Sequence, residues 1–333
     1  MKRLSVLATV SVLALAAAPL LAEGGGWTRK PRAVQRPASS SATSANKSVR
    51  VPPAPATAES YSVQLNIVTR VQGTSFFKTA VDITNNTTTD NVTASYQYCY
   101  TLSGTYQGCT AAQSILLHPL DNFHTDDIVE FLANLLAPGA ADQSFGTFIV
   151  TFDGLPSRNG WEGTVTGRTY SPFDQNDPNF GTVAIAYPGS LFFESASGSL
   201  VGIIRDTRPA PTAAGALRTN LGITNTALFD TVNPVQVQLV FYNATEGSAT
   251  AGSEIGNRLN RTLQAGEVTQ INDVFTAAAI PNDVISVIVF IDVLGPINNQ
   301  NPPTIEGYVN ILDGGTQDGA FFEMKCAAGC ANF

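Results

Sequence analysis

The second half of this chain repeats the first, and this internal repeat constrains the fold more than any other feature. Residues 78–85, Lys-Thr-Ala-Val-Asp-Ile-Thr-Asn, recur at 218–225 as Arg-Thr-Asn-Leu-Gly-Ile-Thr-Asn. The spacing, 218 minus 78, is 140 residues, which is too long for a solenoid unit and right for a domain. We therefore predict two copies of one domain, at 60–197 and 198–325.

Further matches follow in the same order, and their spacing varies only by insertions of loop size. Each copy also opens with a similar strand, at 67–70 and at 203–206, so the boundary falls in the Ser/Gly-rich stretch 195–199. The other matched segments are 126–129 with 272–275, 148–153 with 287–292, 161–165 with 305–309, and 192–194 with 321–323.

The N-terminus has the pattern of a secretory signal. Met1-Lys2-Arg3 is basic, residues 4–21 are apolar, and Ala22 supplies a small residue for cleavage. We predict a signal peptide over 1–22, with an uncleaved membrane anchor as the alternative. After cleavage no transmembrane segment is expected, because no second apolar run is long enough. The predicted location is secreted, periplasmic or cell-surface.

Residues 23–59 have the composition of a disordered linker, being rich in Pro and Ser and carrying six basic side chains. Such a basic tail suits an anionic envelope polymer or lipid headgroups, or it is a plain solvated spacer. The rest of the chain is acidic, which argues against nucleic acid as a partner. The partners we expect are an envelope polymer, a glycan or another protein.

Four cysteines in an exported chain predict disulfides, and four allow three connectivities. The simplest pairing joins Cys99 to Cys109 across two strand ends linked by a Gly turn. Cys326 and Cys330 would then close a small loop in a C-terminal tail, 326–333. That second pair could instead bind a metal or cross-link two chains.

The apolar pattern predicts an all-β fold. Residues 62–67 and 235–242 alternate polar and apolar side chains, as strands with one wet face do. Residues 148–152 and 284–291 are continuous apolar runs typical of central strands. Many short strands with such connections favour a β-sandwich.

One short helix is expected in each copy. Asp127, with Glu130 three residues later, has the pattern of a helix N-cap, and Asp273 should start a shorter helix in the second copy. Pro138 and Pro281 end them. Each helix is predicted to close the open end of its sandwich.

The paired motifs resemble tandem immunoglobulin-like β-sandwich domains of uncharacterised secreted bacterial proteins. The resemblance rests on 78–85 and 218–225, on 271–275, and on the Glu-Gly pairs at 162–163 and 306–307. It spans roughly residues 60–325. It implies architecture and export, with no assigned activity.

The sequence offers little catalytic machinery. Histidine is the usual general base, and the chain has two, His118 and His124. His124 with Asp126 and Asp127 could form half of a metal site, but a loop with a helix cap explains the same residues. No Gly-x-Ser-x-Gly, His-Glu-x-x-His or phosphate-loop motif occurs. No enzyme activity is predicted, and a hydrolase is the least favoured alternative.

Three further groups are candidate sites. Lys78 with Glu162, and Arg218 with Glu306, recur together and predict one structural ion pair per domain. Tyr96, Tyr98 and Tyr100 alternate on one face, which is either a ligand face or ordinary sheet packing. An oxygen-rich loop is either a calcium site or a turn, its candidate ligands being Asp174, Asn176 and Asp177.

These observations predict a secreted, non-catalytic protein that is structural, adhesive or ligand-presenting. The alternative is a carbohydrate-binding or calcium-stabilised accessory protein. No cofactor is expected other than the candidate calcium.

Overall fold

The structure is a computed structural model. One compact unit of the chain, residues 53–333, contains all the residues that it describes. These are residues 59–72, 76–155, 162–171, 183–188, 190–191, 197–206, 213, 215–226, 234–294, 305–315 and 319–328. The predicted signal peptide and linker, residues 192–194, the candidate calcium ligands and the Cys326–Cys330 pair lie outside them in whole or in part.

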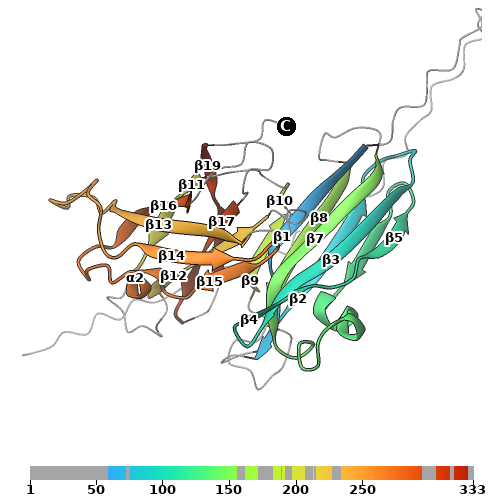
Figure 1. The fold of residues 1–333 in the computed structure, drawn as a ribbon, viewed down its shortest axis with the longest axis horizontal. Helices are drawn as coiled ribbons and strands as arrows, with labels where there is room; N and C mark the ends of the chain where they lie inside the picture. Colours follow the sequence, from blue (N-terminus) through green and yellow to red (C-terminus); the bar gives the residue numbers. More distant parts are fainter. Residues whose placement is uncertain are drawn as a thin grey trace, which may run out of the picture. The chain divides into compact units, whose positions relative to one another are not determined.

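The first half of the described chain, residues 59–191, contains ten strands and one short helix followed by a 3-10 turn (Figure 1). Its elements are β1 (Glu59–Gln72), β2 (Phe76–Asn85), β3 (Val92–Leu102), β4 (Thr105–Cys109), β5 (Gln113–Leu117), β6 (Asn122–Thr125), α1 (Ile128–Phe131), η1 (Ala133–Leu135), β7 (Ser144–Leu155), β8 (Gly163–Tyr170), β9 (Val183–Pro188) and β10 (Ser190–Leu191).

The second half, residues 197–328, contains nine strands and one short helix. Its elements are β11 (Ser197–Ile204), β12 (Leu217–Asn225), β13 (Val235–Asn243), β14 (Leu259–Leu263), β15 (Val268–Ile271), α2 (Val274–Ala277), β16 (Ser286–Leu294), β17 (Ile305–Asp313), β18 (Gly319–Glu323) and β19 (Lys325–Ala328).

The same pairing order recurs in both halves. In the second half the order β14-β13-β16-β11-β19 forms one sheet and β15-β12-β17-β18 the other. The first half repeats these orders as β5-β3-β7-β1-β10 and β6-β2-β8-β9, all antiparallel. There the pairing of β1 with β2 joins the two series into one ten-stranded sheet. The predicted all-β sandwich class is confirmed. Whether each half folds as a separate domain stays a prediction.

Two buried clusters fill the space between the layers. One contains Leu65, Phe148 and Phe152 of the first half, and the other contains Phe241, Phe275 and Ile291 of the second. The first cluster also includes Val268 and Tyr308, which belong to strands of the second half. The halves are therefore packed against each other through apolar side chains.

The strand register corrects our alignment of the opening strands by one residue. A bulge follows Leu65 in β1 and Leu200 in β11, so Arg70 rather than Thr69 is the equivalent of Arg205. The contacts agree. Arg70 Nε lies 2.8 Å from Asp127 Oδ2 at the start of α1, and Arg205 Nε donates to the Val284 carbonyl just beyond α2. In each half, this arginine ties the first strand to the segment around the helix.

Two residues of the repeated motif, a threonine and an asparagine, make equivalent side-chain hydrogen bonds in both halves. The Thr79 hydroxyl donates to the Thr69 carbonyl, and the Thr219 hydroxyl donates to the Ile204 carbonyl at the equivalent position. Asn85 Nδ2 donates to the Leu117 carbonyl at the end of β5, and Asn225 Nδ2 donates to Leu263 at the end of β14. Both threonines and both asparagines are fully buried.

We predict that Asn85→Ala and Asn225→Ala each lower the free energy of unfolding by about 1–3 kcal/mol, because each leaves a buried carbonyl without its donor. Urea unfolding of the two variants measures this. Thr89→Ala, at an exposed hydroxyl, serves as the control. Losses below about 0.5 kcal/mol for both asparagine variants would contradict the shared structural role.

The recurring Glu-Gly pair also has a packing explanation. A Cβ at Gly163 would lie 2.6 Å from the ring of Phe152, and a Cβ at Gly307 would lie 2.9 Å from Ile291 Cδ1. Phe152 and Ile291 are both fully buried. The ladders nevertheless place Gly163 opposite Asn85 and Gly307 opposite Ile223, so the two glycines are two positions apart in the repeat. Each position requires glycine because a side chain from a strand with which it does not pair fills the space that a side chain would need.

The predicted Cys99–Cys109 disulfide is present in the structure. The two cysteines face each other on β3 and β4, which form a hairpin. Ser103 and Gly104 make its turn, both with positive φ, as a two-residue hairpin turn requires.

The helices start where predicted but are short. The Asp127 carboxylate accepts a 3.1 Å bond from the Glu130 amide, which confirms it as the cap of α1. Asp273 precedes α2 but makes no such bond to the helix backbone, so the prediction of a side-chain cap is wrong there. Its φ is +46°, and its carboxylate accepts the Thr276 hydroxyl instead.

Among the described residues, no helix has the length and apolar character needed to span a membrane.

Candidate functional site

The tyrosine face is not a ligand surface. Tyr96, Tyr98 and Tyr100 do share one face of β3, but that face is turned into the core and all three are at most 5% exposed. The Tyr98 hydroxyl donates to the Val68 carbonyl, and the Tyr100 hydroxyl accepts from the Ala137 amide. The alternative of sheet packing is confirmed by this burial. Large side chains at alternate positions are typical of a sandwich core as well as of a ligand surface, so the sequence pattern alone did not distinguish the two.

The two predicted ion pairs do not form. Lys78 stands opposite Tyr170 in the ladder whereas Asn85 stands opposite Gly163. Glu162 is one residue beyond Gly163, so Lys78 and Glu162 are eight positions apart along the strand pair. Arg218 and Glu306 are separated by six positions along β12. At about 3.3 Å per residue, the gaps are about 26 Å and about 20 Å, and both are beyond the reach of the side chains.

The two glutamates are instead buried. Glu306 Oε2 accepts a 3.1 Å bond from Gln64 Nε2, which links β17 of the second half to β1 of the first. Gln64 also donates to the Asn66 side chain. Gln64 and Asn66 are each 1% exposed. The polar face of β1, which we expected to meet solvent, is therefore covered by the other half of the chain.

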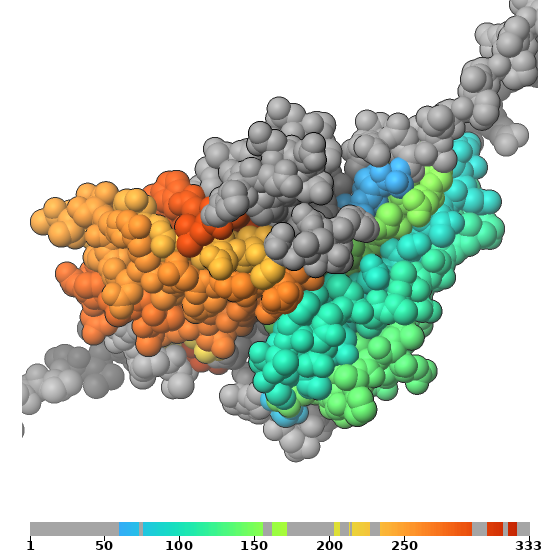
Figure 2. All heavy atoms as spheres, in the orientation of Figure 1, coloured from blue at the N-terminus to red at the C-terminus, as the bar shows by residue number. Residues whose placement is uncertain are grey.

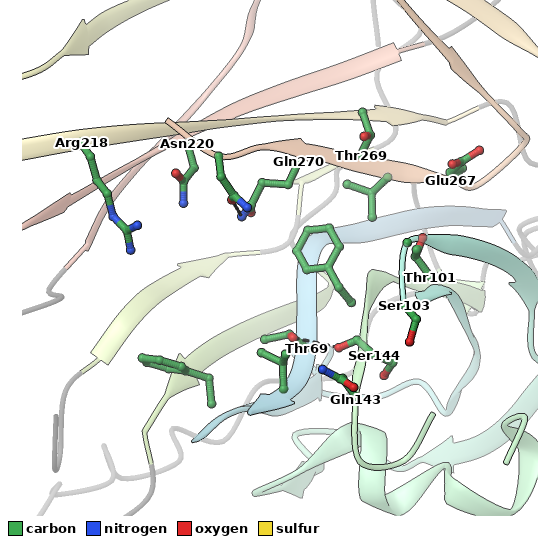
Figure 3. Close-up of a pocket in the computed structure, with 16 residues that line it drawn as sticks. Thr69, Thr101, Ser103, Gln143, Ser144, Arg218, Asn220, Glu267, Thr269 and Gln270 are labelled. Atoms are coloured by element: carbon green, nitrogen blue, oxygen red, sulfur yellow. Dashed lines mark hydrogen bonds between the residues drawn. The ribbon is translucent and has the colours of Figure 1, made fainter. Parts of the chain in front are cut away.

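Beside this buried junction lies a polar cleft, shown in Figure 3. It consists of a hollow of about 660 Å³ and a smaller one of about 170 Å³. Their linings share Thr69, Val71, Phe77, Phe145, Arg218, Asn220 and Gln270. Residues of the second half form one side and residues of the first half the other. The labelled side chains are Arg218, Asn220, Gln270, Thr269 and Glu267 on the first of these sides, and Thr69, Thr101, Ser103, Gln143 and Ser144 on the second.

Three amide side chains form the floor of the cleft, and we call them the amide floor: Asn220, Asn310 and Gln270. Asn220 faces Asn310 across the β12–β17 ladder, and Gln270 of β15 stands opposite Gly222. Asn220 Oδ1 accepts from the Asp273 amide, which leaves its Nδ2 donor for the cleft. Asn310 is 5% exposed, and its Oδ1 has no hydrogen-bond donor in the described part of the chain.

A buried amide oxygen without a donor is costly, and such groups mark sites where a water or ligand supplies the missing bond. Asn310 lines the smaller hollow together with Arg218 and Asn220. The smaller hollow therefore has in its lining an acceptor without a donor in the described part of the chain, Asn310 Oδ1, beside the Asn220 amide.

The two charged groups of the cleft stand at its opposite ends (Figure 3). Arg218 is exposed to solvent. Burial raises the pKa of the Glu267 carboxyl, although the Gln264 amide donates a 2.7 Å hydrogen bond to it. One end of the cleft thus presents a guanidinium, and the other presents a carboxyl group that holds its proton more firmly than usual.

The disulfide hairpin forms part of the wall. Its tip supplies Thr101, Ser103 and Gly104. The Tyr106 hydroxyl donates a 2.6 Å bond to the Ala265 carbonyl of the second half, so the hairpin is joined to the opposite side. Figure 2 shows the teal atoms of the hairpin region in contact with the orange atoms of the second half.

The two histidines lie outside the cleft linings. His124 Nδ1 is 2.9 Å from Asp82 Oδ1 and its Nε2 is 3.2 Å from Asp126 Oδ1, while Asp127 pairs with Arg70. No cluster of three or more His, Cys, Asp or Glu side chains suited to a metal occurs within the described ranges.

The hydrogen bonds to Asp82, and then those to Asp126, raise the pKa of His124. A raised pKa in the folded state stabilises the protein below the unfolded value, and this contribution disappears as pH rises through the folded pKa. We predict that His124→Asn destabilises the protein at about pH 5.5 but not at about pH 8.5, by less than about 1 kcal/mol because the groups are exposed. Thermal unfolding at both pH values measures it, and an equal loss at both would contradict it.

Sequence reasoning missed the cleft because its residues come from both halves. A signal was nevertheless present in the repeat. Ala80 and Arg168 occupy the ladder positions of Asn220 and Asn310, and His124 occupies that of Gln270. Residues that maintain the fold recur in both halves, whereas the amide floor belongs to the second half alone.

Neither the family models nor the curated proteins compared with this chain match it.

Proposed function

We propose that this protein is a non-catalytic binding protein that holds a hydroxyl-rich ligand, a saccharide, in the cleft where its two halves meet. The observation that carries the proposal is the amide floor, which includes the buried and unsatisfied Asn310 Oδ1. Amide and hydroxyl side chains are the usual partners of sugar hydroxyls, since each can donate and accept. Phe77 and Phe145 in the lining supply apolar surface for the C–H faces of a sugar ring.

The proposal includes export from the cell. It is supported by the signal pattern at 1–22 and by the Cys99–Cys109 disulfide, since disulfides persist in oxidising compartments. Fractionation of the producing cells should place the processed chain outside the cytoplasm. Recovery of the unprocessed chain in the cytoplasmic fraction would contradict this part.

Binding is tested by saturation-transfer NMR of the purified protein with a panel of neutral and acidic oligosaccharides. We expect binding of at least one member, loss of that signal in Gln270→Ala, and retention in Gln236→Ala, a glutamine exposed on β13. The bound saccharide should be recovered intact after prolonged incubation. A silent panel, or equal signals from both variants, would overturn the binding site, and shortened products would overturn the non-catalytic assignment.

A further inference from the structure

The cleft has a charge pattern that selects among saccharides, and this inference rests on the proposed function. We propose that the ligand is an acidic saccharide whose uronic acid carboxylate is bound by Arg218 while the ring hydroxyls of the same residue meet the amide floor.

The spacing on β12 supports this pairing. Arg218 and Asn220 are two residues apart and so point to the same face of the strand, about 7 Å apart along it. Asn310 lies directly across from Asn220. In a uronic acid the carboxylate is on one side of the ring and the 2- and 3-hydroxyls are on the other. One sugar residue therefore spans the distance from the guanidinium to the amide floor.

The chemistry of the guanidinium supports a carboxylate in particular. Arginine presents parallel N–H donors that match the two oxygens of a carboxylate, and such bonds are stronger than neutral ones. Its five donors allow it to bind a ligand while keeping another contact. Arg218 lines both hollows and is exposed, so a ligand can reach it.

Asn310 supplies the complementary contact. Its buried Oδ1 accepts no hydrogen bond in the described part of the chain, and a sugar hydroxyl would donate one. Asn220 Nδ2 can donate to the neighbouring hydroxyl oxygen. The two amides thus match a vicinal diol, in which one hydroxyl donates to Asn310 Oδ1 while the other accepts from Asn220 Nδ2.

The other end of the cleft is compatible with an acidic chain. Glu267 would repel a carboxylate if it were ionised, but it lies at the far end from Arg218, and burial disfavours its charged form. The protein carries a formal net charge of −8, so long-range attraction does not bring an anion to the site. Selection must come from the local contact, because physiological salt screens charges beyond about 8 Å.

The test is isothermal titration calorimetry with trigalacturonate and with the same trisaccharide after its carboxylates are reduced to primary alcohols. Arg218→Ala should weaken trigalacturonate binding about tenfold or more. Arg168→Ala removes the same charge from an exposed site outside both linings and should change affinity less than about twofold. The reduced trisaccharide should bind more weakly and should not respond to Arg218→Ala.

A second variant separates ligand binding from folding. Asn310→Leu removes the unsatisfied amide oxygen, so we expect unchanged or higher thermal stability together with about fivefold weaker binding. A merely structural asparagine would show the opposite, a loss of stability with affinity retained, and that result would overturn its role as a ligand contact.

The remaining outcomes are also decisive. Equal binding of the two trisaccharides, with no effect of Arg218→Ala, would overturn the acidic selection and leave the proposed function standing. Binding of neither trisaccharide would overturn the uronic acid assignment. The proposed function falls as well only if the wider NMR panel is silent.

Discussion

Tyr308→Ala should lower the free energy of unfolding by about 3 kcal/mol or more, since it removes a large, fully buried ring. The ring stacks on Phe321 at a centroid distance of 5.5 Å and belongs to the core cluster of the first half. It also covers Gly222, where any side chain would overlap it. Tyr308 thus carries apolar packing from β17 into the other half of the chain.

Chemical denaturation followed by circular dichroism measures this loss. Tyr308→Phe is the matched control, because it keeps the ring and removes the hydroxyl, whose bond to Gln270 is long at 3.4 Å. It should cost less than about 1 kcal/mol. If Tyr308→Ala were as mild as Tyr308→Phe, the packing of the halves through this residue would be refuted.

Gly163→Val should destabilise the protein by about 3 kcal/mol, at the upper end of what overpacking costs. The new side chain would be driven into the ring of Phe152, which is fully buried and has no room to move aside. Gly307→Val should cost less, because the atom nearest to its Cβ is the terminal methyl of Ile291 and the Met324 side chain lies farther away, at 3.3 Å or more.

A double variant tests the cause of this loss. Gly163→Val combined with Phe152→Leu should be less destabilised than the sum of the two single variants, because the smaller side chain makes room for the new one. Urea unfolding of all three variants gives the coupling energy. Simple additivity would show that valine at position 163 acts through something other than contact with Phe152.

The sequence was sufficient for features that depend on local pattern or on recurrence. Alternating and continuous apolar runs indicated strands, and the Gly turn between Cys99 and Cys109 indicated the hairpin and its disulfide. The Asp127 cap follows from a spacing of three residues, which is set within one helical turn.

The predictions that failed concern features that depend on strand register and on tertiary neighbours. Recurrence alone linked Lys78 to Glu162, but the ladder places them at opposite ends of a strand pair. Alternation showed that β1 has two unlike faces, but not that the second half of the chain covers the polar one at Gln64. It likewise could not tell whether Tyr98 faces the core or a ligand. In each case, the deciding information is which segment lies opposite.

The cleft could not be assembled from the sequence for the same reason, since Thr69 and Ser144 meet Arg218 and Gln270 only after both halves are packed. Comparison between the copies nevertheless distinguishes two kinds of position. Thr79 and Asn85 recur as Thr219 and Asn225 because both sandwiches need them. Asn220 and Asn310 have no counterpart of the same type, which is what a binding role specific to one half would leave.

The most direct test of the cleft as the binding site is a crystal structure of the protein with trigalacturonate. We predict that a carboxylate of the ligand lies within hydrogen-bond distance of the Arg218 guanidinium, with a ring hydroxyl donating to Asn310 Oδ1. Ligand density elsewhere on the protein, with the amide floor covered by protein side chains, would contradict the account.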